Sequence, residues 1–341
     1  MQDNNINCNP LRERDLKADK RLFSKIGAGF AVFTVVSTIV SFAIMLTVML
    51  INREFANSTL FKNLVTPISM YIFALPFLLV FLSGCPAEKP PRARLGFGKW
   101  VLLLIVAFGA MSWGSEIGNG IMEVISALVG YDYGNALESL VDGDQLWISI
   151  FFMVTVAPIG EELLFRKLII DRTHRYGAFV SIGLSALLFG LTHGNLYQFF
   201  YCFLVGIILG YVYYSSGNIL LSIAIHASLN FVGTVIVSLI SPTADALMEA
   251  DPQSLSEFFA FAGENALGSC GLLIYTAFMY GAMLCAIVLP LAFFKRLMPS
   301  QGDLMLPRGK VFTTVMLNVG MISLIIIYIF EFAINLLPTG A

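Results

Sequence analysis

Long apolar stretches recur along the whole chain, and they restrict its fold more than any other feature. About 20 consecutive apolar residues are enough for one helix to cross the hydrocarbon core of a bilayer. Of the 341 residues, 57% are hydrophobic and only 12% are charged, whereas soluble domains carry about 25% charged residues. We therefore predict an all-α, polytopic transmembrane helix bundle of about 8–9 transmembrane helices. The nine candidate spans are 26–52, 64–84, 100–122, 146–170, 177–194, 196–214, 219–241, 268–294 and 311–335.

The basic residues support this count and give it an orientation. If the N-terminus lies in the cytosol, every one of the 20 Lys and Arg residues except Arg53 and Lys62 falls on the inner side. Cytoplasmic segments of membrane proteins carry such an excess of positive charge. We therefore expect an integral membrane protein, in the plasma membrane of a bacterium, with a cytosolic N-terminus. The net charge of −2 argues against nucleic acid as a partner.

The spans divide the chain into five regions. We expect residues 1–25 to be a cytosolic N-terminal segment and residues 26–145 to be N-terminal transmembrane helices. Residues 146–241 contain the candidate chemistry, and residues 268–341 form C-terminal transmembrane helices. Residues 242–267 contain five acidic residues and no basic one, so we interpret them as an acidic external loop.

Two adjacent carboxylates stand inside the fourth span. Pro158 and Gly160 precede Glu161 and Glu162, and Arg166 follows. Residues four apart share one face of a helix, so Glu162 and Arg166 can pair, whereas Glu161 points about 100° away. An arginine that neutralises one carboxylate leaves the other able to act as a base. The alternative is that this stretch is only the charged end of a helix at the inner membrane interface.

Two histidines inside apolar stretches follow the carboxylates within 70 residues. His193 comes four residues after Phe189, and His226 comes four residues before Asn230. The second spacing places an imidazole and an amide on one helix face, where two hydrogen-bond donors can hold an oxyanion. A single histidine in a membrane span is more often a packing group, but these polar groups together indicate a reaction site.

The motifs resemble those of a known family in spacing and in order. EExxxR (Glu161, Glu162, Arg166), FxxxH (Phe189, His193) and HxxxN (His226, Asn230) occur on successive spans. This pattern is similar to that of the CPBP family, the CAAX proteases and bacteriocin-processing proteins, also called type II CAAX endopeptidases or Abi proteins. The resemblance covers roughly residues 146–240, which would thus be CPBP-like catalytic helices.

The resemblance implies an intramembrane endopeptidase whose site opens toward the cytosol. Glu161 would be the general base that activates the attacking water, with Glu162 and Arg166 as its support. His193 would help to position the water, and His226 and Asn230 would stabilise the oxyanion. The implied partners are the lipid bilayer and a membrane-associated protein or peptide substrate. Prenylated CAAX proteins are one class of such substrates.

The role of a metal is open at this point. Glu161, His193 and His226 are residue types that bind Zn²⁺, and they would leave a position for water. The HExxH signature is absent, and pairing of His226 with Asn230 suits an oxyanion better than a metal. We therefore favour a glutamate mechanism that requires no cofactor, with zinc as the alternative.

Two other classes of protein remain as alternatives. A proton- or ion-coupled transporter would spread polar residues over many helices in repeated halves, whereas here they concentrate in four consecutive spans. A non-catalytic membrane protein, such as a scaffold that confers bacteriocin immunity, would be compatible with the same sequence.

Overall fold

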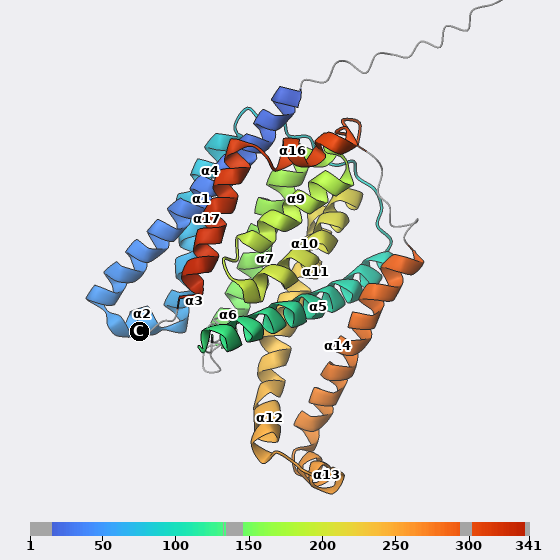
Figure 1. Ribbon diagram of the computed structural model, residues 1–341. Helices are drawn as coiled ribbons and strands as arrows, with labels where there is room; N and C mark the ends of the chain where they lie inside the picture. The colour runs from blue at the N-terminus through green and yellow to red at the C-terminus, as the bar shows by residue number, and fades with distance from the viewer. Residues whose placement is uncertain (1–15, 132, 134–145, 294–301, 338–341) are drawn as a thin grey trace, which may run out of the picture.

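The computed structural model describes residues 16–131, 133, 146–293 and 302–337, and the elements in this part of the chain are helices (Figure 1). The first half consists of α1 (Leu16–Ile51), α2 (Arg53–Asn57), α3 (Thr59–Pro67), η1 (Ile68–Ala74), α4 (Leu75–Leu82) and α5 (Phe97–Val129). The central part consists of α6 (Leu146–Ser149), η4 (Ile150–Val156), α7 (Ala157–Glu161), η5 (Glu162–Ile170), α8 (Asp171–Thr173), η6 (His174–Tyr176), α9 (Ala178–Leu191) and α10 (Leu196–Ser216). The chain continues with α11 (Ile219–Phe231), η7 (Val232–Ile236), α12 (Val237–Ala250), α13 (Leu255–Glu264), α14 (Ala266–Ala292), η8 (Arg308–Lys310), α16 (Val311–Val315) and α17 (Val319–Asn335).

The predicted helical membrane bundle is confirmed. Among the described residues, seven continuous helical segments are long and apolar enough to cross a bilayer. Two shorter apolar helices, α9 and α17, coincide with the predicted spans 177–194 and 311–335. Each of the nine predicted spans therefore has a helical counterpart, although α9 with 14 residues is short for a crossing on its own.

Three of the long segments contain the four π-helical stretches of the described residues, and this rare conformation occurs often at functional sites. The first is η1, which follows Pro67, a residue that lies inside α3. The second and third, η4 and η5, flank the short helix α7, and the fourth is η7 at the end of α11. A π-helical turn rotates the side chains that follow it relative to those before it, so these stretches affect which residues face one another.

Glycines allow several helices to approach closely. A side chain on Gly114 of α5 would overlap the backbone of α10 at Tyr201, and one on Gly320 of α17 would overlap the backbone of α1 at Ser24. Gly206 and Gly210 of α10 both face α9. The first and last described helices are thus in direct contact, although they are far apart in sequence (Figure 1).

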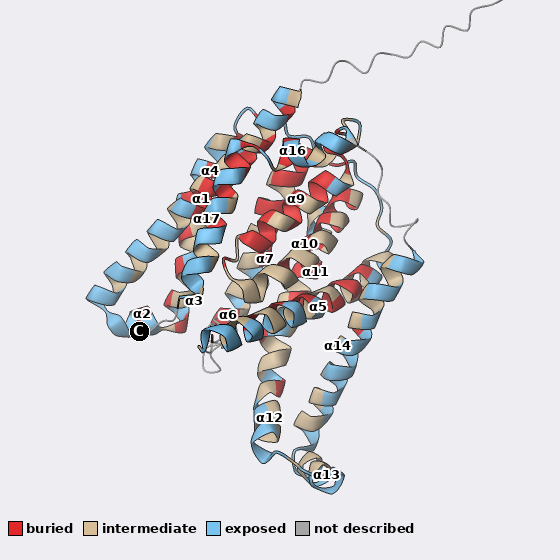
Figure 2. Cartoon of the chain, viewed as in Figure 1, coloured by how far each residue is buried: buried red, intermediate tan, exposed pale blue. Residues whose placement is uncertain are grey.

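The core has two principal clusters of buried apolar side chains. Figure 2 shows buried residues along α9, whereas α12, α13 and α14 are mostly intermediate or exposed. One cluster joins α1, α4, η5, α9 and α17 and includes Phe165 and Phe189. The other joins α5, α10, α11 and α14 and includes Ile225 and Leu229. Because η5 belongs to the first cluster and α11 to the second, residues on these two helices meet at the boundary between the clusters.

Two predicted regions need correction. Residues 242–267 are mostly helical and do not form a loop, since α12 extends to Ala250 and α13 follows. The predicted loop rests on the acidic residues of this region. Two of them, Asp245 and Glu249, are exposed on a helix rich in good helix formers. Helix α1 begins at Leu16, within the predicted segment 1–25, and Tyr176 donates a 2.7 Å hydrogen bond to Asp19 there. Residues 1–15 and 134–145 of the predicted N-terminal regions lie outside the described residues.

Candidate active site

The predicted pair of Glu162 and Arg166 is confirmed as a buried contact. Arg166 Nε lies 3.2 Å from Glu162 Oε2, and both side chains have 0% exposure. This contact is an ion pair without a hydrogen bond, because its atoms do not meet the angular requirements of a hydrogen bond. The guanidinium group also lies over the ring of Phe189, with 4.5 Å between Cζ and the ring centroid. An aromatic face in this position stabilises a cation that has lost its water.

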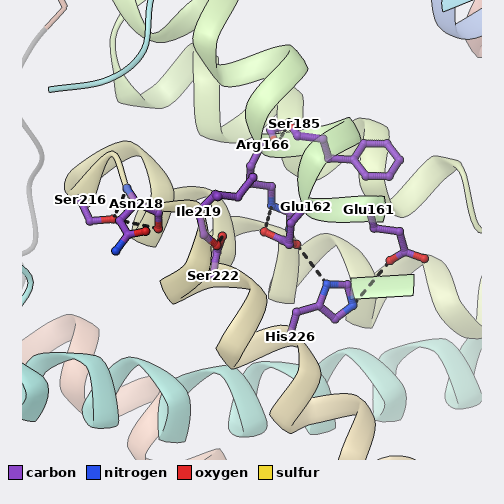
Figure 3. Close-up of polar contacts among 10 residues, drawn as sticks. Glu161, Glu162, Arg166, Ser185, Ser216, Asn218, Ile219, Ser222 and His226 are labelled. Atoms are coloured by element: carbon purple, nitrogen blue, oxygen red, sulfur yellow. Dashed lines mark hydrogen bonds and ion pairs between the residues drawn. The ribbon is translucent and has the colours of Figure 1, made fainter. Parts of the chain in front are cut away.

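His226 lies between the two carboxylates and contacts each of them through a different ring nitrogen (Figure 3). Its Nδ1 is 3.1 Å from Glu162 Oε1, and its Nε2 is 3.5 Å from Glu161 Oε2. Glu162 is fully buried, whereas the Glu161 side chain keeps 18% of its surface exposed. The two neighbouring carboxylates therefore have different surroundings, since Glu162 is enclosed by Arg166 and His226 whereas Glu161 is partly exposed.

Ser222 completes the surroundings of Glu162. It is fully buried one helical turn before His226, and its hydroxyl is part of the polar surroundings of the Glu162 carboxylate. The same hydroxyl is 2.9 Å from the carbonyl oxygen of Ile219. Sequence reasoning missed this residue, although its spacing of four from His226 already placed both side chains on one face of α11.

His193 lies in the turn between α9 and α10, and its ring is fixed by its neighbours. Its Nδ1 is 2.8 Å from the carbonyl oxygen of Phe189, and the two rings are perpendicular with centroids 5.0 Å apart. Phe189 also packs edge-on against His226, at 5.6 Å between centroids. Phe189 thus contacts both histidines and Arg166.

The turn that carries His193 is held by helix α17. Tyr328 donates a hydrogen bond of 3.2 Å to Thr192 Oγ1, and Asn335 Nδ2 donates one of 2.7 Å to the carbonyl oxygen of Gly194. Glu331 packs against the same glycine, whose φ of 70° lies in the left-handed region that favours glycine. Since these three residues are spaced along one face of α17, that face fixes the position of the turn.

Asn230 lies on α11 one turn after His226, as the spacing predicted. Its amide Nδ2 donates a 2.7 Å hydrogen bond to the carbonyl oxygen of Met153, which belongs to η4. The side chain is half-buried. Direct contacts therefore join four of the candidate residues, namely Glu161, Glu162, Arg166 and His226. Asn230 is instead bonded to the backbone of η4.

The role of zinc stays a prediction. Within the described residues, no group of three or more His, Cys, Asp or Glu side chains is gathered as a metal site. His193 Nδ1 contacts a backbone carbonyl and His226 Nδ1 contacts Glu162, so Nε2 of each ring is the nitrogen left for another partner.

Tyr71, Tyr201 and Cys202 also line the surroundings of Glu161, and sequence reasoning did not single them out. All three are close enough to interact electrostatically with the Glu161 carboxylate. Tyr201 and Cys202 come from α10, and Tyr71 comes from η1. None of them belongs to a recognisable spacing motif, so only the folded arrangement shows their proximity.

The fold and the site together define a helical membrane protein with a buried carboxylate–histidine–arginine centre. Residues 143–232 match the family described as type II CAAX prenyl endopeptidase Rce1-like, which confirms the predicted resemblance over about a quarter of the chain. All six candidate residues, from Glu161 to Asn230, lie inside the matched segment. Comparison with curated proteins and with solved structures found no match. The apolar helices indicate an integral membrane protein, and its candidate site lies in the segment that is similar to a CAAX-type prenyl endopeptidase.

Proposed function

We propose that this protein is an intramembrane endopeptidase in which Glu161 activates the water that attacks the peptide bond. The observation that carries the proposal is the placement of His226 between two carboxylates of unequal exposure, at 3.1 Å from Glu162 and 3.5 Å from Glu161. Glu162 is already occupied by Arg166 and His226. Glu161 is therefore the carboxylate that is free to exchange a proton with a bound water.

In the first step, a water lies between the Glu161 carboxylate and the carbonyl carbon of the scissile bond. Glu161 takes one proton from the water as the oxygen attacks the carbon, and the carbonyl becomes a tetrahedral oxyanion. In the second step, the same proton passes from Glu161 to the leaving nitrogen, and the C–N bond breaks. The two products are a carboxylic acid and an amine, and Glu161 returns to its charged form.

The oxyanion needs hydrogen-bond donors that are already in place when its charge develops. We assign this role to His226 Nε2–H and to the second proton of the Asn230 amide, because the first proton is used on Met153. Donation from Nε2 requires a ring that is protonated on both nitrogens while Nδ1–H is bound to Glu162. Such a ring carries a positive charge, and the two carboxylates beside it offset that charge.

His193 has a positioning role in this mechanism. With Nδ1 fixed on the Phe189 carbonyl, Nε2 is the ring nitrogen that remains to contact the attacking water. The mechanism uses side chains of this chain alone, and no cofactor takes part in a step.

The substrate class to test first is a membrane-anchored C-terminal peptide, such as a prenylated CAAX peptide. The purified protein in detergent is incubated with a farnesylated peptide, and the released tripeptide is identified by mass spectrometry. We expect cleavage by the wild type and no cleavage by Glu161→Gln, while Glu116→Gln, which changes an exposed carboxylate on α5, remains active. Cleavage by folded Glu161→Gln at the wild-type rate would contradict the glutamate mechanism. Failure of the wild type on membrane-anchored peptides of varied sequence would favour the scaffold or transporter alternatives.

A further inference from the structure

The π-helical stretches gather around the candidate active site. Helix η5 begins at Glu162 and contains Arg166, and η4 provides the carbonyl of Met153 that binds Asn230. Helix η7 starts just after Asn230, and its Thr234 hydroxyl contacts the sulfur of Met153. Three of the four stretches therefore carry residues of the site or residues that bind them. The fourth, η1, has no role in the mechanism described so far.

The residue at the centre of η1 is Tyr71, and its ring lies directly against Gly160. A Cβ on Gly160 would overlap both Cζ and the hydroxyl oxygen of Tyr71. Gly160 is followed at once by Glu161, so the absence of a side chain at residue 160 brings the phenol to the residue next to the proposed base. The hydroxyl end of the ring, and not its edge near Cβ, makes this contact.

The chemistry of a phenol suits this position. Its O–H is a neutral donor, and Tyr71 is near enough to Glu161 for the two side chains to interact electrostatically. The Glu161 carboxylate has two oxygens, and one of them faces His226. A donor on the carboxylate would restrict its rotation and determine how its oxygens face the attacking water.

We propose that Tyr71 is a positioning residue of the active site, whose hydroxyl donates a hydrogen bond to the Glu161 carboxylate when the catalytic water is bound. This inference rests on the proposed function. It adds to the site a residue from a helix that lies outside the segment matched to the CAAX protease family. It also gives Gly160 a role, since a larger residue there would displace the phenol.

The first test is the kinetics of Tyr71→Phe on a farnesylated peptide. We expect kcat to fall about ten-fold while KM changes less than two-fold, because one hydrogen bond that acts on the base is lost and the substrate contacts remain. Tyr275→Phe, which changes a half-buried tyrosine on α14, serves as the control and keeps the wild-type kcat. A kcat for Tyr71→Phe within two-fold of the wild type would overturn the inference, whereas retained activity of Glu161→Gln would overturn the proposed function.

The second test uses the contact between Tyr71 and Gly160. We expect Gly160→Ala to lower kcat in the wild type and to have a much smaller effect when Tyr71→Ala has already removed the ring. An equal effect in both backgrounds would show that displacement of Tyr71 is not the cause.

A third measurement does not depend on activity. The thermal unfolding of Tyr71→Phe, Glu161→Gln and the double variant forms a cycle, and a hydrogen bond between the two side chains makes the changes in Tm non-additive. Additive changes would overturn the inference even if no peptide substrate were cleaved.

Discussion

Arg166 and Glu162 form an ion pair in which neither side chain is exposed and Nε lies 3.2 Å from Oε2. Removal of one member of a buried pair leaves the other charge without compensation, which costs about 3–5 kcal/mol. We therefore expect Arg166→Ala to be inactive and also less stable by about this amount, as measured by thermal unfolding of the purified protein. A stability equal to that of the wild type would show that the pair does not support the fold.

The same helix provides a control for this prediction. Lys167 Nζ lies 3.2 Å from Asp171 Oδ2, but 44% of the lysine side chain is exposed. Exposed ion pairs contribute about 0–1 kcal/mol, so Lys167→Ala should unfold close to the wild-type temperature. The double variant Glu162→Gln with Arg166→Met removes both charges, and we expect it to regain part of the stability but none of the activity.

Substitution of Asn230 should lower the rate of peptide cleavage more than it lowers the stability of the protein. Loss of one oxyanion donor typically lowers kcat by about 10²–10³-fold, so we expect this reduction for Asn230→Ala in cleavage assays. Asn63→Ala is the matched control, since Asn63 also donates its amide to a backbone carbonyl but lies on α3. If the two variants had the same kcat, Asn230 would have only the structural role shown by its bond to Met153.

The sequence predicted the fold class and the pairing of Glu162 with Arg166, because both depend on local spacing. Stretches of about 20 apolar residues indicate spans without any knowledge of their packing. The separation of four residues between Glu162 and Arg166 predicts their pairing on one helix face. For the same reason, the six candidate residues were found from motifs that lie within about 70 residues of one another.

The remaining features depend on contacts between distant helices, which spacing does not reveal. No pattern linked Tyr71 to Gly160, which is 89 positions later in the chain, or Asn335 to Gly194. The sequence also gave no sign that His226 would bridge both carboxylates, because Glu161 and Glu162 point in different directions on an ideal helix. The π-helical geometry of η5, which follows Glu161, alters that ideal rotation.

Removal of metals should leave the activity unchanged. We expect protein that has been treated with a chelator and then dialysed to keep its cleavage rate, because the proposed steps use Glu161 and polar side chains alone. Elemental analysis of the same sample is the necessary control. Stoichiometric zinc together with loss of cleavage on its removal, and recovery on its return, would contradict the glutamate mechanism.

Helix α17 holds the turn that carries His193, so we expect substitution of Asn335 on this helix to lower the rate of catalysis. Asn335→Ala removes the 2.7 Å hydrogen bond to the Gly194 carbonyl and should loosen the turn that carries His193. We expect a several-fold lower kcat and faster hydrogen exchange of residues 190–196. Asn265→Ala, which removes an exposed amide bonded to a carbonyl of α13, should change neither quantity.

The close approach of α1 and α17 predicts strong sensitivity at one glycine. A side chain on Gly320 would overlap the backbone of Ser24, so Gly320→Val should separate the two helices and yield little folded protein. Gly281 of α14 has open space where its Cβ would be, and Gly281→Val should be tolerated. Folded yield by size-exclusion chromatography in detergent compares the two, and equal yields would show that the contact is dispensable.

The hydrogen bonds from α17 to the turn that carries His193 have a consequence for biosynthesis. Translation proceeds from the N-terminus, so Glu161, His193 and His226 leave the ribosome well before Tyr328 and Asn335 do. A nascent chain that already contains all three motifs still lacks the helix that fixes one of its histidines. The last of the described helices to be synthesised is therefore required before the turn of His193 is fixed in place.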